Sequence, residues 1–426
     1  MAMAPVCCSG PAPLASREAG LVSLSEAQRR TVFEKVLDTV NKKFMGPEPD
    51  IQKLRRDHED EVVRSATAEA FEQAITGVLK QLGTSHTGCF HESRPRAAGR
   101  IALAATFMKA ETPEGLRWMF QDVHPGGVAA RAGIRPGDIL LTIDDKEFRP
   151  PDAMPFALAQ TYVVTVRKAD GKTIRYMLAV PGSKEKQRPI VVPDQVVTAS
   201  KLRDGVGLVR VSMFPGVLGM DVARDITRAI ADLGCARLVL DLRGNTGGGI
   251  GCLRVMSHLC ADRRGVGYSV SRAVVKHGYD KSRLPVFDHI PSSKWGVIPL
   301  MFRFARAGRS VAVFTEALGA QRHHGHVALL VNEHSASAAE MVAGFASEYG
   351  LATLVGVKTA GRLVATSAFK VGFGYRIAIP VAAYYTWRGQ NLEGQGVTPH
   401  VQEPLSPQGL WNGYDNQCER ALECLT

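Results

Sequence analysis

One strand-to-helix junction constrains the fold of this 426-residue chain more than any other segment. Residues 327–331 form a short aliphatic run bounded by polar residues, which predicts a buried β-strand. The run ends at a Ser-Ala-Ser turn, after which Met341, Phe345 and Tyr349 recur every four residues, as in a helix. A serine at such a junction can cap the helix with its side-chain oxygen. It can also act as a nucleophile, because the helix N-terminus favours negative charge and the next backbone N–H can hold an oxyanion.

A second predicted strand runs into a glycine-rich loop. Residues 236–243 have the pattern of a buried strand, and four of the six residues at 244–249 are glycine. Glycine costs backbone entropy, so this density implies unusual dihedral angles or a close approach of main chain to a ligand. A loop of this kind ahead of a helix, here residues 250–259, can direct N–H groups at a negatively charged centre. Phosphate binding is disfavoured, because the loop lacks both the Lys-Ser/Thr of a P-loop and the G-x-G-x-x-G spacing.

Residues 331–340 resemble the nucleophile segment of a serine peptidase family, that of the carboxyl-terminal processing proteases and the tricorn core. In that family the nucleophile is the middle serine of a Ser/Thr-Ala-Ser-Ala-Ser/Ala-Glu run, and here this serine is Ser337. The resemblance implies an oxyanion hole formed by the backbone N–H of Ala338 and that of one glycine of residues 247–249, taken as Gly248. It also implies a multi-domain α/β fold with a crotonase-like ββα protease core.

The residue that accepts the serine proton differs between two branches of this family. In the processing-protease branch it is a lysine, but Arg362 occupies the matching position here, and an arginine does not deprotonate in a protein. Lys358 could replace that lysine only with a different geometry. The tricorn-like branch takes a histidine from a Ser-His pair ahead of a PDZ domain, which matches Ser85 and His86. The chain therefore resembles the Ser-His branch more closely than the Ser-Lys branch.

The Ser-His branch also uses a glutamate shortly before a Gly-Val-x-Pro segment, and Glu393 matches it. The resemblance implies that Ser337 attacks the scissile carbonyl and that His86 accepts its proton. Ser85 and Glu393 would then orient and polarise His86. Each residue also has a structural alternative, as a half-buried histidine, a turn serine or a solvated carboxylate. The four motifs occur in the order expected for the family, which favours the catalytic interpretation.

The middle of the chain resembles a PDZ domain. Small residues at 128–132 predict a short helix, a Pro-Gly-Asp turn at 136–138 leads into an apolar strand, and alternation at 162–176 predicts a hairpin. Such domains bind a peptide terminus by adding it as a strand to a sheet edge. A purely structural role is the alternative. The resemblance places the carboxylate-binding loop at Gly115, Leu116, Arg117 and Trp118.

The chain is long enough for several domains, and 45% hydrophobic residues can fill their cores. The helical segment before the PDZ domain has one helix from Ser25 and a second at about residues 66–82. The polar, proline-containing span 262–325 is taken as an irregular insertion, with residues 295–304 as its packed part. The predicted domains are a disordered N-terminus (1–20), an N-terminal helical domain (21–98), the PDZ domain (99–180), a linker (181–200) and the protease core (201–426).

The net charge of +11 comes from scattered residues, and no Lys/Arg run has the length of a nucleic-acid-binding patch. The cysteines have no metal-binding spacing, and nothing near the histidines of residues 323–326 completes a ligand set, so we expect neither a metal nor a cofactor. No transmembrane stretch or signal peptide is evident, which predicts a cytoplasmic location. A periplasmic or exported location is the alternative, because members of the family are often exported.

The sequence thus predicts a serine endopeptidase that hydrolyses unfolded chains or peptides and captures a peptide terminus on its PDZ domain. The partner is a peptide or unfolded protein, with no nucleic acid, and a homo-oligomer is left open. The alternative is a catalytically inactive protein on the same fold that binds a peptide or a hydrophobic ligand. Two departures from the family support this alternative, Arg362 in place of the lysine and His400 where an aspartate usually follows the proline.

Overall fold

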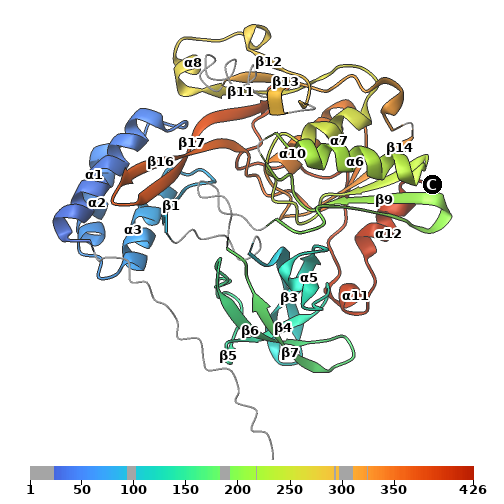
Figure 1. Ribbon diagram of the computed structural model, residues 1–426, viewed down its shortest axis with the longest axis horizontal. Helices are drawn as coiled ribbons and strands as arrows, with labels where there is room; N and C mark the ends of the chain where they lie inside the picture. The colour runs from blue at the N-terminus through green and yellow to red at the C-terminus, as the bar shows by residue number, and fades with distance from the viewer. Residues whose placement is uncertain are drawn as a thin grey trace, which may run out of the picture.

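The computed structural model describes residues 24–93, 102–182, 192–216, 218–291, 294–296, 310–323 and 325–426. These residues form a helical unit, a smaller β unit and an α/β core, which confirms the predicted α/β class (Figure 1). The N-terminal residues 1–20, predicted to be disordered, lie outside the described residues. In the described part of the chain, no helix is both long enough and apolar enough to cross a membrane.

The core is built on a largely parallel sheet with the strand order β18-β15-β14-β10-β9-β8. Helices α6, α7 and α10 cover one face, and α12 covers the other. Both faces are therefore buried, which explains why the central strands read as continuous apolar runs. The strands are β8 (Val197–Lys201), β9 (Val206–Val211), β10 (Arg237–Asp241), β14 (His326–Val331), β15 (Thr353–Gly356) and β18 (Val401–Gln402). The helices are α6 (Met220–Leu233), α7 (Cys252–Leu259), α10 (Ala338–Tyr349) and α12 (Asn416–Glu423).

Strand β8 corrects one predicted boundary. The linker was expected to run through residue 200, but residues 197–201 pair with β9 at the edge of the core sheet. Their polar sequence, Val-Thr-Ala-Ser-Lys, suits an edge strand whose side chains are mostly exposed, and a run of that composition resembles a linker.

A second sheet joins the core to the N-terminal helices, with the order β1-β17-β11-β13-β12 and β16 paired to β17. Its strands are β1 (Gly88–His91), β11 (Gly265–Ser271), β12 (Val286–Phe287), β13 (Val311–Phe314), β16 (Val364–Gly372) and β17 (Tyr375–Thr386). Strands β11 and β13 lie inside the span 262–325, so the prediction of an irregular insertion is wrong for these residues. Their short alternating patterns are surrounded by prolines and polar residues, which hid them. The prediction that residues 295–304 are packed is also wrong in their described part, since Trp295 is 80% exposed.

The N-terminal unit contains three helices rather than the two expected: α1 (Glu26–Lys43), α2 (Ile51–Val63) and α3 (Ala68–Lys80). Ser25 starts α1 with a capping box. The apolar faces of these helices pack against Val371, Tyr375 and Ile377 of the second sheet. Strand β1 follows α3 closely and pairs antiparallel with β17. The segment between α3 and β1, which carries Ser85 and His86, is thereby fixed against the core.

The β unit predicted to be a PDZ domain has the sheet order β2-β3-β4-β6-β7 (Figure 1). Its elements are β2 (Ala105–Thr112), β3 (Gly115–Val123), α5 (Val128–Arg131), β4 (Ile139–Ile143), β5 (Lys146–Glu147), β6 (Thr161–Arg167) and β7 (Thr173–Ala179). On one sheet face, Met119 and Ile139 pack against Leu410 of the C-terminal helix α11 (Pro407–Trp411). The C-terminal segment thus holds this unit against the core. Another short helix, α8 (Arg272–Lys276), follows β11.

The predicted carboxylate-binding loop is wrong. Gly115, Leu116, Arg117 and Trp118 open strand β3 and pair in register with β2, from Gly115 opposite Thr112 to Trp118 opposite Lys109. A carboxylate-binding loop needs unpaired N–H groups, whereas these residues belong to a hairpin ladder. Residues 115–118 match only in part the Gly-Leu-Gly-Phe motif that is typical of the carboxylate-binding loop of PDZ domains, and the strand pattern of residues 115–123 prevails over it.

Candidate active site

Ser337 lies at the N-cap of α10, after the turn that leaves β14. Its backbone adopts φ 56° and ψ −117°, a region that a residue with a Cβ atom rarely occupies. Strained dihedrals of this kind concentrate at functional sites, where the surrounding structure holds them in place. The side chain is half-buried, so the hydroxyl sits at the N-terminus of a twelve-residue helix with partial access to solvent.

The carboxylate of Glu340 holds the Ser337 turn in place through hydrogen bonds. Glu340 is fully buried and accepts four hydrogen bonds. Its Oε2 accepts from the Ser337 N–H at 3.0 Å and from the Arg362 N–H at 2.8 Å. Its Oε1 accepts from the Thr359 hydroxyl and the Gly361 N–H, each at 2.7 Å. This one side chain therefore ties the nucleophile turn to the segment at residues 359–362.

The glycine loop lies directly against Ser337. A Cβ atom built on Gly247 would be 2.6 Å from the Ser337 Cβ and 2.8 Å from the Ala338 nitrogen. The Gly247 N–H is already used, because it donates to the Asn245 side chain at 2.8 Å. Within the described residues, the N–H groups of Gly248 and Ala338 have no acceptor, whereas Gly249 donates to Phe214. Both N–H groups predicted for the oxyanion hole are therefore available to an oxyanion.

We expect Gly247→Ala to destabilise the protein more than Gly350→Ala. Both glycines have positive φ, 89° and 61°, so both substitutions impose backbone strain of about 1 kcal/mol. Only Gly247 has neighbours in the way of a Cβ atom, and displacing packed atoms adds about 1–3 kcal/mol. Gly350 ends the same helix with open space around it. Urea unfolding of both variants measures the difference, and equal free energies of unfolding would contradict the close approach of the loop to Ser337.

Ser85, His86 and Glu393 form a connected group. The Ser85 N–H and hydroxyl both donate to the Glu393 carboxylate, at 2.6 and 3.0 Å, and the Ser85 oxygen lies 2.7 Å from His86 Nδ1. A hydroxyl has one proton, so the Ser85 oxygen accepts from His86 Nδ1–H while its own proton goes to Glu393. The Nε2 atom of the neutral ring then carries the lone pair, which is the state that a general base requires. His86 is exposed and, like Ser337, has positive φ, 60°.

Two consecutive peptide groups connect the Ser85 group to the Ser337 turn. The Arg362 N–H donates to Glu340, and the next N–H, that of Leu363, donates to Glu393 Oε2 at 2.7 Å. Neighbouring residues therefore bind the two carboxylates, Arg362 that of Glu340 and Leu363 that of Glu393. Hydrogen bonds from residues 359–363 thus connect the Ser337 turn with the Ser85 group, while residues 115–118 stay in the PDZ hairpin.

The two basic residues of this segment, Lys358 and Arg362, both have exposed side chains. Lys358 follows β15, and its side chain is exposed. The next residue, Thr359, is buried and turns its hydroxyl to Glu340. Arg362 is exposed and contributes its backbone N–H to Glu340. In the described part of the chain, no group of three or more His, Cys, Asp or Glu residues is placed to hold a metal ion.

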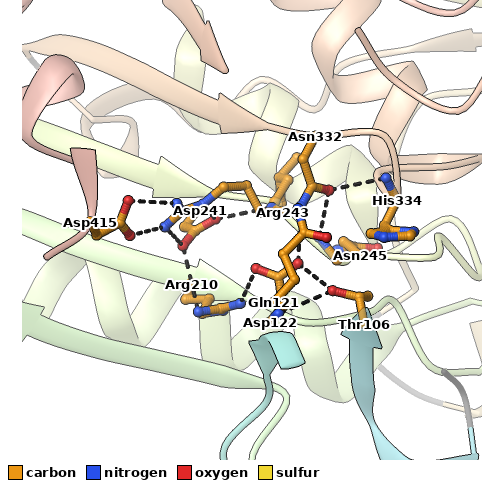
Figure 2. A network of polar contacts seen from close by, with 12 residues as sticks. Thr106, Gln121, Asp122, Arg210, Asp241, Arg243, Asn245, Asn332, His334 and Asp415 are labelled. Carbon is orange, nitrogen blue, oxygen red and sulfur yellow. Dashed lines mark hydrogen bonds and ion pairs between the residues drawn. The ribbon is translucent and has the colours of Figure 1, made fainter. Parts of the chain in front are cut away.

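Sequence reasoning missed a buried polar network behind the glycine loop (Figure 2). Arg243 pairs with Asp241 at 2.9 Å and with Asp415 at 2.7 Å, and Arg210 lies between Asp241 and Asp122 of the PDZ unit. Burial alone would raise the pKa values of Asp122 and Asp241, but the two guanidinium groups hold both below their ordinary range. The only available signal was a charged Asp-Leu-Arg ending an apolar strand, which identifies no partners.

A histidine of the PDZ unit also lies against this network. Burial and the nearby Arg210 lower the pKa of His124 to about 4, so its ring is neutral at pH 7. The ring packs against Gly244 at the start of the glycine loop, where a Cβ atom would be 2.9 Å from His124 Nε2. The PDZ unit and the glycine loop therefore share a closely packed, polar boundary.

Two segments of the chain match known protein families. Residues 205–403 match peptidase family S41, and residues 119–160 match the PDZ domain. The core is a peptidase S41 domain. The matched span of this S41 domain contains Ser337, the glycine loop, Glu340 and Glu393. It begins after Ser85 and His86, which come from the N-terminal unit.

Relatives of the chain are named as processing proteases. The chain is 26% identical over 313 residues to the carboxyl-terminal-processing protease of Picosynechococcus sp., covering 71% of this chain and 65% of that protein. It is 27% identical over 375 residues to the protein of the same name from Synechocystis sp., covering 83% and 77%. It thus spans less than two thirds of the first of these relatives. The resemblance to this peptidase family is confirmed for the core, and these two relatives are named carboxyl-terminal-processing proteases.

The fold around the S41 domain also has a solved counterpart. The structure resembles that of a photosystem II D1 C-terminal processing protease, with a TM-score of 0.52 and 19% identity, covering 93% of this chain and 97% of that one. This likeness extends over the helical unit, the PDZ domain and the S41 domain. It establishes the fold, while the assignment to the Ser-His branch stays a prediction.

Proposed function

We propose that this chain is a serine endopeptidase that hydrolyses unfolded chains or peptides with Ser337 as nucleophile and His86 as general base. One observation carries the proposal: the Glu393–Ser85–His86 group is bound to the same segment that holds the Ser337 turn. A histidine, a group that orients it and a strained serine at a helix N-terminus are the parts of a serine hydrolase site.

The chemistry follows from these positions. The Ser337 hydroxyl oxygen attacks the scissile carbonyl carbon as its proton passes to His86 Nε2. The carbonyl oxygen becomes an oxyanion, stabilised by the N–H groups of Gly248 and Ala338. When this intermediate collapses, the C–N bond breaks, and the leaving amine takes the proton from His86. Water, deprotonated by His86, then hydrolyses the acyl ester and regenerates Ser337.

The PDZ domain supports a role in substrate capture. Within the described residues, strand β2 is the edge of the PDZ sheet and pairs only with β3, so its other side can accept an added peptide strand. One edge acceptor of β2 is already engaged, since His334 Nε2 lies 3.2 Å from the Phe107 carbonyl oxygen. His334 belongs to the turn that precedes Ser337. A peptide added along β2 would thus end beside the nucleophile turn.

Of the two departures that favour a catalytically inactive binding protein, Arg362 and His400, one has a structural explanation. His400 is a structural residue in this fold: its Nδ1 accepts from the Leu354 N–H at 3.1 Å, and its Nε2 lies 3.2 Å from the Ser347 hydroxyl. It joins α10 to β15, so its departure from the family pattern has a packing explanation. Arg362 is then the remaining departure, and it argues against a lysine base rather than against catalysis.

A fluorophosphonate probe tests the proposal directly. We expect the probe to label wild-type protein at Ser337 and to leave Ser337→Ala unlabelled, because only a serine activated by a base reacts readily. Ser347→Ala is the matched control, since it removes another serine of α10 and should label like wild type. Label found on a different residue by peptide mapping, or equal labelling of Ser337→Ala, would refute the assignment.

A further inference from the structure

One buried hydrogen bond crosses from the PDZ domain to the nucleophile turn. The side-chain amide of Asn332 donates to Asp122 Oδ2 at 2.9 Å. Asp122 lies near the end of β3 in the PDZ domain, and Asn332 is the first residue after β14 in the S41 domain (Figure 2). Asn332 is fully buried, and Asp122 is 4% exposed. A hydrogen bond to a charged group in such surroundings is costly to leave unmade.

Asn332 in turn connects the two loops that form the proposed site. Its side-chain oxygen accepts from the Gly244 N–H at 2.9 Å, where the glycine loop begins, and from the His334 N–H at 3.1 Å. Its backbone N–H donates to the Ser335 hydroxyl, which donates to the Leu242 carbonyl at 2.7 Å. The Asn332 side chain therefore sets the position of the glycine loop relative to the turn that carries Ser337.

The carboxylate of Asp122 determines which way this amide faces. An asparagine amide has an acceptor side and a donor side, and an ionised carboxylate can only accept. With Asp122 opposite, the NH₂ group must face the PDZ domain, and the oxygen must face Gly244 and His334. Asp122 is itself held by the Thr106 hydroxyl at 2.6 Å and by Arg210 at 3.1 Å.

We propose that Asp122 of the PDZ domain is a positioning residue for the peptidase site, acting through Asn332 to hold the oxyanion loop against the Ser337 turn. The inference rests on the proposed function, because it assumes that the Gly248 and Ala338 N–H groups and Ser337 act together. It assigns the PDZ domain a part in the chemical step that is separate from binding a peptide. Its loss should therefore lower kcat and leave KM nearly unchanged.

Exchanging the two side chains provides the test. Asn332→Asp places two carboxylates against each other, which should disorder the loops and lower kcat on a peptide, and the rate of fluorophosphonate labelling, by about 10²-fold. Adding Asp122→Asn restores a donor facing an acceptor, and the aspartate at 332 can still accept from Gly244 and His334. We expect this double variant to recover to within about fivefold of wild type. Asp122→Asn alone is the mildest change, and we expect its labelling rate to lie between those of wild type and Asn332→Asp.

Asp138→Asn is the control for a general loss of stability. It weakens the ion pair between Asp138 and Lys168 inside the PDZ domain, so it should lower the unfolding midpoint and leave the labelling rate unchanged. All rates are compared on protein shown to be folded by circular dichroism. If the double variant with Asp122→Asn and Asn332→Asp folds but is labelled as slowly as Asn332→Asp, the inference is overturned. Labelling of Asn332→Asp at the wild-type rate would also overturn the inference. If Asn332→Asp does not fold, labelling of Asp122→Asn at the wild-type rate would overturn it. Failure of wild-type protein to label would instead refute the proposed function.

Discussion

Replacing His86 by alanine should lower kcat/KM for peptide hydrolysis by about 10⁴-fold or more, while replacing Lys358 should leave most of the activity. The reason is the arrangement of the Ser85 hydroxyl, which directs its proton to Glu393 and so leaves His86 Nε2 as the basic atom. Without the ring, the Ser337 hydroxyl has no group to take its proton. The exposed Lys358 follows β15, and the side chain next to it, Thr359, is the one bonded to Glu340.

The double variant of Ser337 and His86 separates a shared mechanism from two independent effects. Residues that act as one unit are strongly non-additive, so Ser337→Ala with His86→Ala should be no slower than Ser337→Ala alone. Initial rates on a short fluorogenic peptide measure all of these variants. Activity that survives in His86→Ala and disappears in Lys358→Ala would establish a Ser–Lys mechanism in place of the Ser-His one.

Substituting Glu340 by glutamine should destabilise the protein by about 3 kcal/mol or more and abolish labelling of Ser337. Four donors converge on this buried carboxylate, two on each oxygen. Glutamine keeps one acceptor oxygen and places an NH₂ group against the other two donors. The turn at Ser337 then loses its connection to residues 359–362. Urea unfolding gives the stability, and the fluorophosphonate rate gives the effect on the site.

Glu333→Gln is the matched control for that substitution. Glu333 lies on the same turn and accepts a hydrogen bond from Gln121, but its side chain is 47% exposed. Exposed polar contacts contribute little, so we expect a change within about 0.5 kcal/mol. Equal destabilisation by both variants would show that the convergence of donors on Glu340 is unimportant for stability.

The nucleophile segment was accessible from sequence because its signals are local. A strand, a Ser-Ala-Ser turn and a helix with apolar residues every four positions fall within 23 consecutive residues, 327–349. The glycine loop was accessible for the same reason. Glu340 lies in the same segment, yet its importance depends on donors at residues 359–362, which no periodicity reveals. Asp122 and Asn332 are 210 residues apart in the chain, so their hydrogen bond could not be foreseen from spacing.

The errors have a common physical cause. A partial motif predicts a loop at residues 115–118, and the polar or proline-rich flanks of strands β8, β11 and β13 predict a linker or an insertion there. In each case pairing with a neighbouring strand decides the structure, and that neighbour is distant in sequence. Helix α2 was overlooked because its exposed face is densely charged, and only Leu54, Val62 and Val63 are buried.

On the proposed mechanism, the bond between Ser85 and Glu393 determines when the chain can become active. The two residues are separated by 308 positions, and strand β1 pairs with β17, which also belongs to the last part of the chain. During synthesis the N-terminal helices and the PDZ domain emerge first, and the histidine remains without its orienting carboxylate until Glu393 has left the ribosome. The PDZ edge of a growing chain can therefore pair with an extended strand before the site for hydrolysis is complete. On the proposed mechanism, the growing chain therefore cannot hydrolyse its own unfinished C-terminal half.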